Sequence, residues 1–133
     1  MALEDLRRQL GLDAESVAPD ALPEAARGLR EGVLAIAAAG GYAEILAAML
    51  AAEWMYLTWC EAAHARGAGR EAPADWIRLH IEPAFRGEVA WLMRRLDQLG
   101  PDLPAREQER CAANFGRVLA LEIAFHDAPY ADA

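Results

Sequence analysis

Residues 42–66 read YAEILAAMLAAEWMYLTWCEAAHAR, and the prediction of the fold starts from this stretch. Its apolar residues recur at helical spacing, and no glycine or proline interrupts them, which predicts one long helix. Gly40 and Gly41 precede the stretch and Gly67 follows it, which predicts a break at each end. One stripe of the predicted helix carries Leu46, Met49, Glu53, Tyr56 and Cys60. The stretch is therefore either ordinary core or one wall of a pocket that contains a carboxylate.

The rest of the chain is also helical in its periodicity, and no stretch alternates apolar and polar residues as a strand does. Pro83 separates two of the predicted helices, and Pro129 ends the last one. The connecting segments are short, so neighbouring helices are expected to be antiparallel. Further helices are predicted over residues 2–10, 24–39, 73–81, 84–99 and 105–127. We predict one all-α domain over residues 1–133, folded as a helical bundle.

The composition excludes several classes of protein. The net charge is −8, and nucleic-acid binding needs a basic surface, so we expect no nucleic acid as partner. The two cysteines, Cys60 and Cys111, are not in a CxxC pair, and no zinc-ligand spacing or disulfide framework is present. No apolar run reaches the roughly 18 residues of a membrane span, and the start of the chain has no signal-peptide pattern. We therefore expect a cytoplasmic protein that does not interact with membranes.

Three apolar faces each contain one ionisable group: Glu53 in the long helix, His80 in the short one and Glu122 in the last one. The face around Glu122 consists of Cys111, Phe115, Val118, Glu122 and Phe125, and the face around His80 consists of Trp76, Ile77, His80 and Ile81. A carboxylate among apolar residues is costly unless it is paired or protonated. The coincidence of three such groups favours a bundle that encloses a small polar site.

An ordinary structural explanation stands beside this one. A glutamate on an apolar stripe often lies at its edge and pairs with an arginine, here Arg94 or Arg117. A histidine on an apolar face is often a core residue, and aromatic residues at helical spacing often fill the core. On this explanation the three groups mark no site.

Three motifs in order resemble the TenA/thiaminase II family. They are AAMLAAEWMY at residues 47–56, WIRLH at residues 76–80 and LEIAFHDAPY at residues 121–130. The resemblance covers nearly all of this chain but only the C-terminal part of a usual member, so it implies that the family's N-terminal helices are absent. It implies an all-helical fold similar to haem oxygenase. It also implies an activity that hydrolyses thiamin, or an aminopyrimidine salvaged from degraded thiamin.

The resemblance assigns roles to residues one by one. The position of the family's nucleophilic cysteine is Ala52 here, and a tyrosine position of the family is His80. Tyr56, the pocket residues Glu122 and Phe125, and the closing Tyr130 are retained. Cys60 lies eight residues from Ala52, about 12 Å along the helix axis, so it cannot take the place of that nucleophile. We expect Cys60 to be a core residue. The predicted catalytic residue is Glu122, and the predicted ligand-binding residues are Glu53, Tyr56, His80, Phe125 and Tyr130.

Three functions remain open. The first is a small-molecule-binding protein related to thiamin pyrimidine salvage that lacks Cys-dependent activity, since no thiolate is available at Ala52. The second is an aminopyrimidine hydrolase with Glu122 as general acid and base. The third is a metal site formed by Glu122 and His126, which are four residues apart on one helix. No cofactor and no resident metal is expected in the first two cases.

Absence of the N-terminal helices has a consequence for partners. The helices that remain are expected to expose an apolar face, which single soluble chains rarely do. We therefore expect a homodimer, or a separate partner that supplies the missing helices.

Overall fold

The computed structural model describes residues 22–67 and 74–131, so the helix predicted at residues 2–10 lies outside the described part. In the described part every regular element is helical, which confirms the all-α class. The α-helices are α2 (Glu24–Ala39), α3 (Tyr42–Ala65), α4 (Ala74–Leu79), α5 (Pro83–Leu99) and α6 (Ala105–Asp127), and the short 3₁₀ segments are Gly100–Asp102 and Ala128–Tyr130. No helix of the described ranges has both the length and the hydropathy needed to cross a membrane.

The prolines and glycines set most of these boundaries. Gly40 and Gly41 separate α2 from α3 as the sequence predicts. Pro83 is the first residue of α5, where its fixed φ angle suits a helix start and its missing N–H costs nothing. The short helix α4 ends at Leu79, two residues before the predicted end, and His80 and Ile81 follow in a turn.

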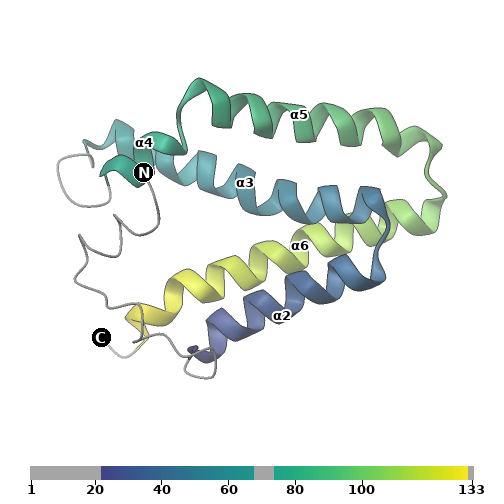
Figure 1. The fold of residues 1–133 in the computed structure, drawn as a ribbon, viewed down its shortest axis with the longest axis horizontal. Helices are drawn as coiled ribbons and strands as arrows, with labels where there is room; N and C mark the ends of the chain where they lie inside the picture. Colours follow the sequence, from purple (N-terminus) through teal and green to yellow (C-terminus); the bar gives the residue numbers. More distant parts are fainter. Residues whose placement is uncertain (1–21, 68–73, 132–133) are drawn as a thin grey trace.

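Helix α3 is the centre of the bundle. It packs against α5 on one side and against α6 and α2 on the other, and Figure 1 shows α5, α3, α6 and α2 in this order from top to bottom. Helices α5 and α6 are joined by a short turn but diverge, and in the described part they make little contact with each other. The reason is that α3 has buried residues on several of its faces, so it can be covered from both sides.

The core is consequently divided into two clusters. The first joins α2, α3 and α6 through Ile36, Ala48, Ala51 and Val118, and the second joins α3 and α5 through Leu46, Leu50, Val89 and Leu92. Ala51 is completely buried, and its small side chain lets α3 approach α6 closely. Cys60 is also buried, as the sequence predicts for a core residue.

A buried carboxylate fixes the start of α3. Glu44 is 4% exposed, accepts a hydrogen bond from the Gly41 N–H at 2.8 Å and pairs with the Arg110 guanidinium of α6. A side chain at Gly40 would place its Cβ 2.7 Å from the Glu44 carboxylate and 2.8 Å from the Ile36 carbonyl oxygen. Only glycine therefore fits at this corner between α2, α3 and α6.

Candidate functional site

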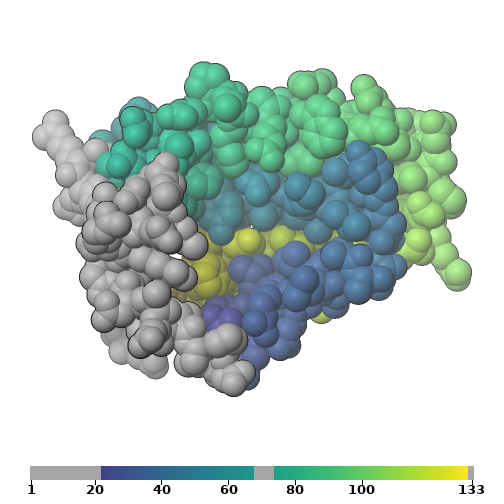
Figure 2. Space-filling view, in the orientation of Figure 1, coloured from purple at the N-terminus to yellow at the C-terminus, as the bar shows by residue number. Residues whose placement is uncertain are grey.

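A pocket of about 220 Å³ lies between α2 and α3, with α6 as its floor. Figure 2 shows the corresponding recess, with α6 in yellow set between α3 and α2. Most of its lining is apolar, and the two ionisable side chains in it are the carboxylates of Glu53 and Glu122. The apolar lining consists of Val33, Ile36, Ala37, Ile45, Ala48, Met49, Ala52 and Val118. Two of the three ionisable groups that the sequence singles out therefore line one pocket.

Glu122 is the most buried polar group of this pocket, at 6% exposure. The hydroxyl of Tyr56 on α3 donates a hydrogen bond to Glu122 Oε2 at 3.0 Å. Burial, and then the negative charge of Glu122, raises the pKa of Tyr56 above its usual range, so this hydroxyl keeps its proton and stays a donor. In the described part, the groups nearest the carboxylate are therefore Tyr56 and His126, and not Arg94 or Arg117.

An aromatic cluster surrounds Tyr56 and holds its ring. The ring centroid of Tyr56 lies 5.4 Å from Trp76, 5.5 Å from His80 and 5.6 Å from His126. Contacts of this kind each add about 0.5–1.5 kcal/mol beyond the buried area. The cluster joins the α3, α4 and α6 segments, so it fixes the direction from which the hydroxyl reaches Glu122.

Both histidines of the cluster form a hydrogen bond between Nδ1 and a backbone carbonyl oxygen. Nδ1 of His80 donates to the Trp76 carbonyl at 2.7 Å, and Nδ1 of His126 donates to the Glu122 carbonyl at 2.8 Å. A carbonyl oxygen only accepts, so Nδ1 of each ring carries a proton, and the backbone bond does not use Nε2. His126 Nδ1 is also 3.8 Å from Glu122 Oε2. The two rings therefore act here as supports of the Tyr56–Glu122 pair.

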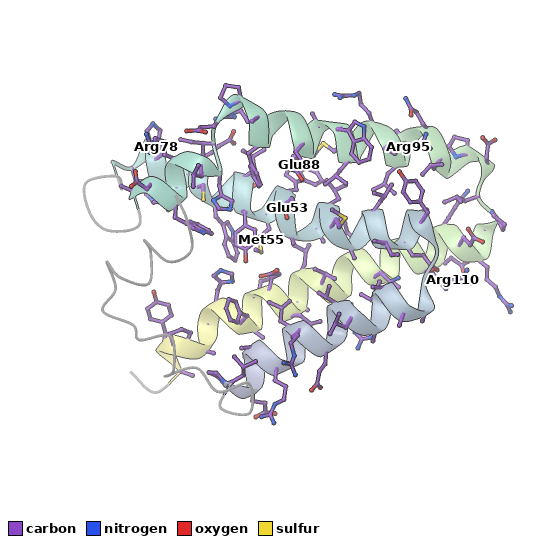
Figure 3. All side chains as sticks on the ribbon, in the orientation of Figure 1. Glu53, Met55, Arg78, Glu88, Arg95 and Arg110 are labelled. Carbon is purple, nitrogen blue, oxygen red and sulfur yellow. The ribbon has the colours of Figure 1, made fainter. Side chains whose placement is uncertain are left out.

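Glu53 is half-buried at the edge of the same pocket. Burial raises the pKa of Glu53, and the neighbouring charges of Glu88 and Glu122 raise it further, while His80 opposes the shift. Figure 3 shows Glu53 on α3 close to Glu88 on α5. Glu53 is therefore more easily protonated than an ordinary surface glutamate.

Ala52 and Cys60 lie in different places. Ala52 is on the pocket wall together with both carboxylates, and its methyl group leaves room there. Cys60 is 1% exposed and does not line the pocket, and burial raises the pKa of its thiol. Cys60 is thus in a poor position to replace a nucleophile at residue 52.

Phe125 and Tyr130 do not line the carboxylate pocket. They lie at a second hollow of about 620 Å³ near the C-terminal end of α6, which Pro23 and Ala26 also line. Phe125 is connected to the Tyr56 cluster through His126, with ring centroids 5.1 Å apart. Of the predicted ligand-binding residues, the structure thus places Glu53 on the pocket, Tyr56 against Glu122, and His80 against Tyr56.

The described residues contain no group of three or more His, Cys, Asp or Glu side chains arranged to hold a metal ion. Glu122 and His126 are adjacent as their spacing predicts. The Nδ1 of His126 donates to the backbone carbonyl of Glu122, so only Nε2 of this ring could bind a metal ion. Within the described residues, no further His, Cys, Asp or Glu side chain completes a metal site with this pair.

Two aromatic contacts are absent from the sequence prediction of the site. The sequence places Trp76 only on the face of His80, yet its ring contacts Tyr56, and Trp59 contacts His126 with ring centroids 5.1 Å apart. The spacing between Trp76 and His80 gives a usable signal, because residues four apart share a helix face. For Trp59 no such signal exists, because its partner comes from another helix.

The fold and the pocket define a class: a small all-α bundle with a buried carboxylate facing an apolar pocket. The chain belongs to the TENA/THI-4/PQQC family, whose family model matches residues 2–132. This family has a haem oxygenase-like fold, in agreement with the observed helices. No curated protein and no solved structure gives a significant match to the chain.

Proposed function

We propose that this chain is a small-molecule-binding member of its family that holds an aminopyrimidine-like compound of thiamin salvage, without Cys-dependent hydrolysis. The observation that carries the proposal is the buried Glu122 carboxylate on an apolar pocket, held by the Tyr56 hydroxyl at 3.0 Å. The proposal places the ligand against Glu122, next to Ala52.

The chemistry of the pocket supports a flat ring that carries an amine. Apolar walls favour the ring, and a carboxylate accepts strong, charge-assisted hydrogen bonds from amino groups. Pockets for drug-sized ligands usually measure about 300–1,000 Å³. The 220 Å³ of this pocket is smaller and suits a single-ring compound.

Ala52 is the reason to propose that this chain does not carry out the reaction of a nucleophilic cysteine. The family resemblance puts the nucleophilic thiolate at this position, and a methyl group cannot attack a ring carbon. The nearest thiol along α3 is Cys60, which is buried away from the pocket.

The test is calorimetric titration with the pyrimidine half of thiamin bearing an aminomethyl group. Wild type should bind it, and Glu122→Gln should bind at least about tenfold more weakly, since a hydrogen bond to a charged group contributes about 1.5–3 kcal/mol. Ala52→Leu should also lose binding, because the larger side chain fills the pocket.

The matched control is Glu109→Gln, an exposed glutamate on the same helix as Glu122. This variant should bind like wild type, and circular dichroism should show that all variants keep their helices. Binding that survives both Glu122→Gln and Ala52→Leu would place the ligand elsewhere and contradict the proposal.

A second candidate function is hydrolysis of the same compound, favoured by the presence of Glu53 beside Glu122. Two carboxylates in unlike environments suit an acid and a base. Glu122 would take a proton from water while the water oxygen bonds to the carbon that carries the amine. The C–N bond would break, and a protonated Glu53 would give its proton to the leaving amine.

Ammonia release distinguishes the two candidates. If the chain is a hydrolase, wild type should slowly release ammonia from the aminomethyl compound. This release should be lost in both Glu122→Gln and Glu53→Gln. Binding by wild type without any ammonia release would overturn the hydrolase and leave the binding function standing.

A further inference from the structure

Helices α3 and α5 together leave an apolar surface uncovered. Tyr42 is 54% exposed, Met49 is 43% exposed and Trp91 is 46% exposed. We call the surface formed by Tyr42, Met49, Glu88, Trp91 and Arg95 the α3/α5 face. Figure 2 shows parts of α5 and of the adjoining α3 at the surface. Trp91 is four residues from Arg95 on α5, and Arg95 lies over the Tyr42 ring, so these three side chains lie near one another. Exposed aromatic side chains that lie near one another mark an interaction surface more often than a free monomer surface.

The charges on this face form an ordered pattern. Glu88 and Arg95 are seven residues apart on α5, which puts them about two turns, or roughly 10.5 Å, apart on the same side of the helix. Trp91 lies between them along the helix, and Figure 3 shows Arg95 nearer than Glu88 to the C-terminal end of α5. The guanidinium of Arg95 lies 5.7 Å from the centroid of the Tyr42 ring, so its position is held by α3.

This pattern is complementary to itself. If two α5 helices meet antiparallel around a two-fold axis near Trp91, Glu88 of each copy faces Arg95 of the other. An isologous contact needs this property, because each patch must fit its own copy. A strongly acidic or strongly basic partner would satisfy only one of the two charges.

We propose that the α3/α5 face is a homodimer interface, in which α5 pairs antiparallel with α5 of a second copy of this chain. The two Trp91 side chains form its centre, and the two Glu88–Arg95 pairs form its rim. Met49 belongs both to this face and to the lining of the carboxylate pocket. The second copy therefore covers one side of the pocket mouth. The proposal is independent of the ligand that the pocket binds.

Charge reversal tests the proposal, with sedimentation equilibrium as the measurement. Wild type should be a dimer. Glu88→Arg and Arg95→Glu should each weaken dimerisation at least about tenfold, because each turns two attractive pairs into two repulsive ones. The double variant with both reversals should recover the wild-type dimer, because each pair between the copies then again joins one positive and one negative side chain.

The controls separate dimerisation from damage to the fold. Arg95→Glu also loses its contact with Tyr42 inside the chain, and the double variant does not restore that contact. Recovery of the dimer in the double variant therefore reports on the contact between copies. Glu109→Arg and Arg106→Glu reverse exposed charges on α6 and should leave the dimer unchanged. A monomeric wild type, or a double variant that stays as weak as the single ones, would overturn the proposal.

Discussion

At the scale of single residues, the hydroxyl of Tyr56 decides how well the Glu122 carboxylate is satisfied. Tyr56→Phe removes that donor and keeps the ring, so the buried carboxylate loses a hydrogen bond at a cost of about 1–3 kcal/mol. The free energy of unfolding from urea denaturation, at fixed protein concentration, should fall by this amount. The matched control is Tyr42→Phe, whose residue is 54% exposed and should change stability by less than about 0.5 kcal/mol. Equal effects of the two substitutions would show that the Tyr56–Glu122 bond contributes nothing.

The two cysteines give a second prediction at this scale. Alkylation needs the thiolate, and burial raises the pKa of both Cys60 and Cys111. Iodoacetamide should therefore react slowly with the native protein at neutral pH, faster at alkaline pH, and with Cys111 before the more buried Cys60. Mass spectrometry of timed samples checks the order. Modification of native Cys60 as fast as in the urea-unfolded chain would show that this thiol is not in the core.

At the scale of elements, Glu44 connects the start of α3 to α6. The Arg110 hydrogen bond, followed by that of the Gly41 N–H, lowers the pKa of Glu44. A lowered folded-state pKa means that the ion pair stabilises the fold above the ordinary carboxyl value of 4.5, and that this contribution is lost as the pH falls through the folded-state pKa.

We expect Glu44→Gln to have a lower melting temperature than wild type at neutral pH. The difference between the two melting temperatures should become smaller in acid. Thermal unfolding followed by circular dichroism from neutral pH to about pH 3 measures it. The control is Glu109→Gln on the exposed side of α6. Its melting temperature should follow that of wild type at every pH. A gap for Glu44→Gln that is constant with pH would contradict the role of the Glu44 charge.

A glycine within α6 gives another prediction for the elements. An added Cβ at Gly116 meets nothing within 4 Å, so Gly116→Ala should gain the helix preference of alanine, about 0.5–1 kcal/mol. At Gly32 in α2 the new Cβ would lie 2.4 Å from Leu121 Cδ1, so that side chain must move. The free energy of unfolding from urea denaturation should therefore increase less in Gly32→Ala than in Gly116→Ala. The reverse order would mean that Gly116 has a role beyond the helix.

At the scale of the whole molecule, the sequence predicts where each helix begins and ends better than it predicts which helices pack together. The bounds 24–39 and 105–127 follow from periodicity and from Gly40, Pro104 and Pro129, which act locally. The divergence of α5 from α6 does not follow, because the short turn between them predicts adjacency. The packing preference of α3, covered on both sides, outweighs the short connection. Figure 1 also shows α3 and α6 running in the same direction, as two successive antiparallel connections imply. That α3 and α6 pack against each other does not follow from the order of the helices.

The sequence also predicts only part of the candidate site. The stripes identify Glu53 and Glu122 as ionisable groups on apolar faces, and both do line one pocket. A stripe does not specify which helix it faces, so the partnership of Tyr56 with Glu122 across α3 and α6 needed the structure. For the same reason Phe125 and Tyr130, in sequence beside Glu122, lie at a different hollow.

The proposed ligand site is the pocket between α2, α3 and α6. An NMR titration of methyl-labelled protein with the aminomethyl pyrimidine can locate the bound compound. We expect the methyl signals of Ala52, Met49 and Val118, which line the pocket, to shift in proportion to binding. The methyl signals of Leu96 and Leu103, which line a separate hollow between α5 and α6, should stay in place. Shifts at Leu96 and Leu103 alone, or no shifts at saturating ligand, would contradict it.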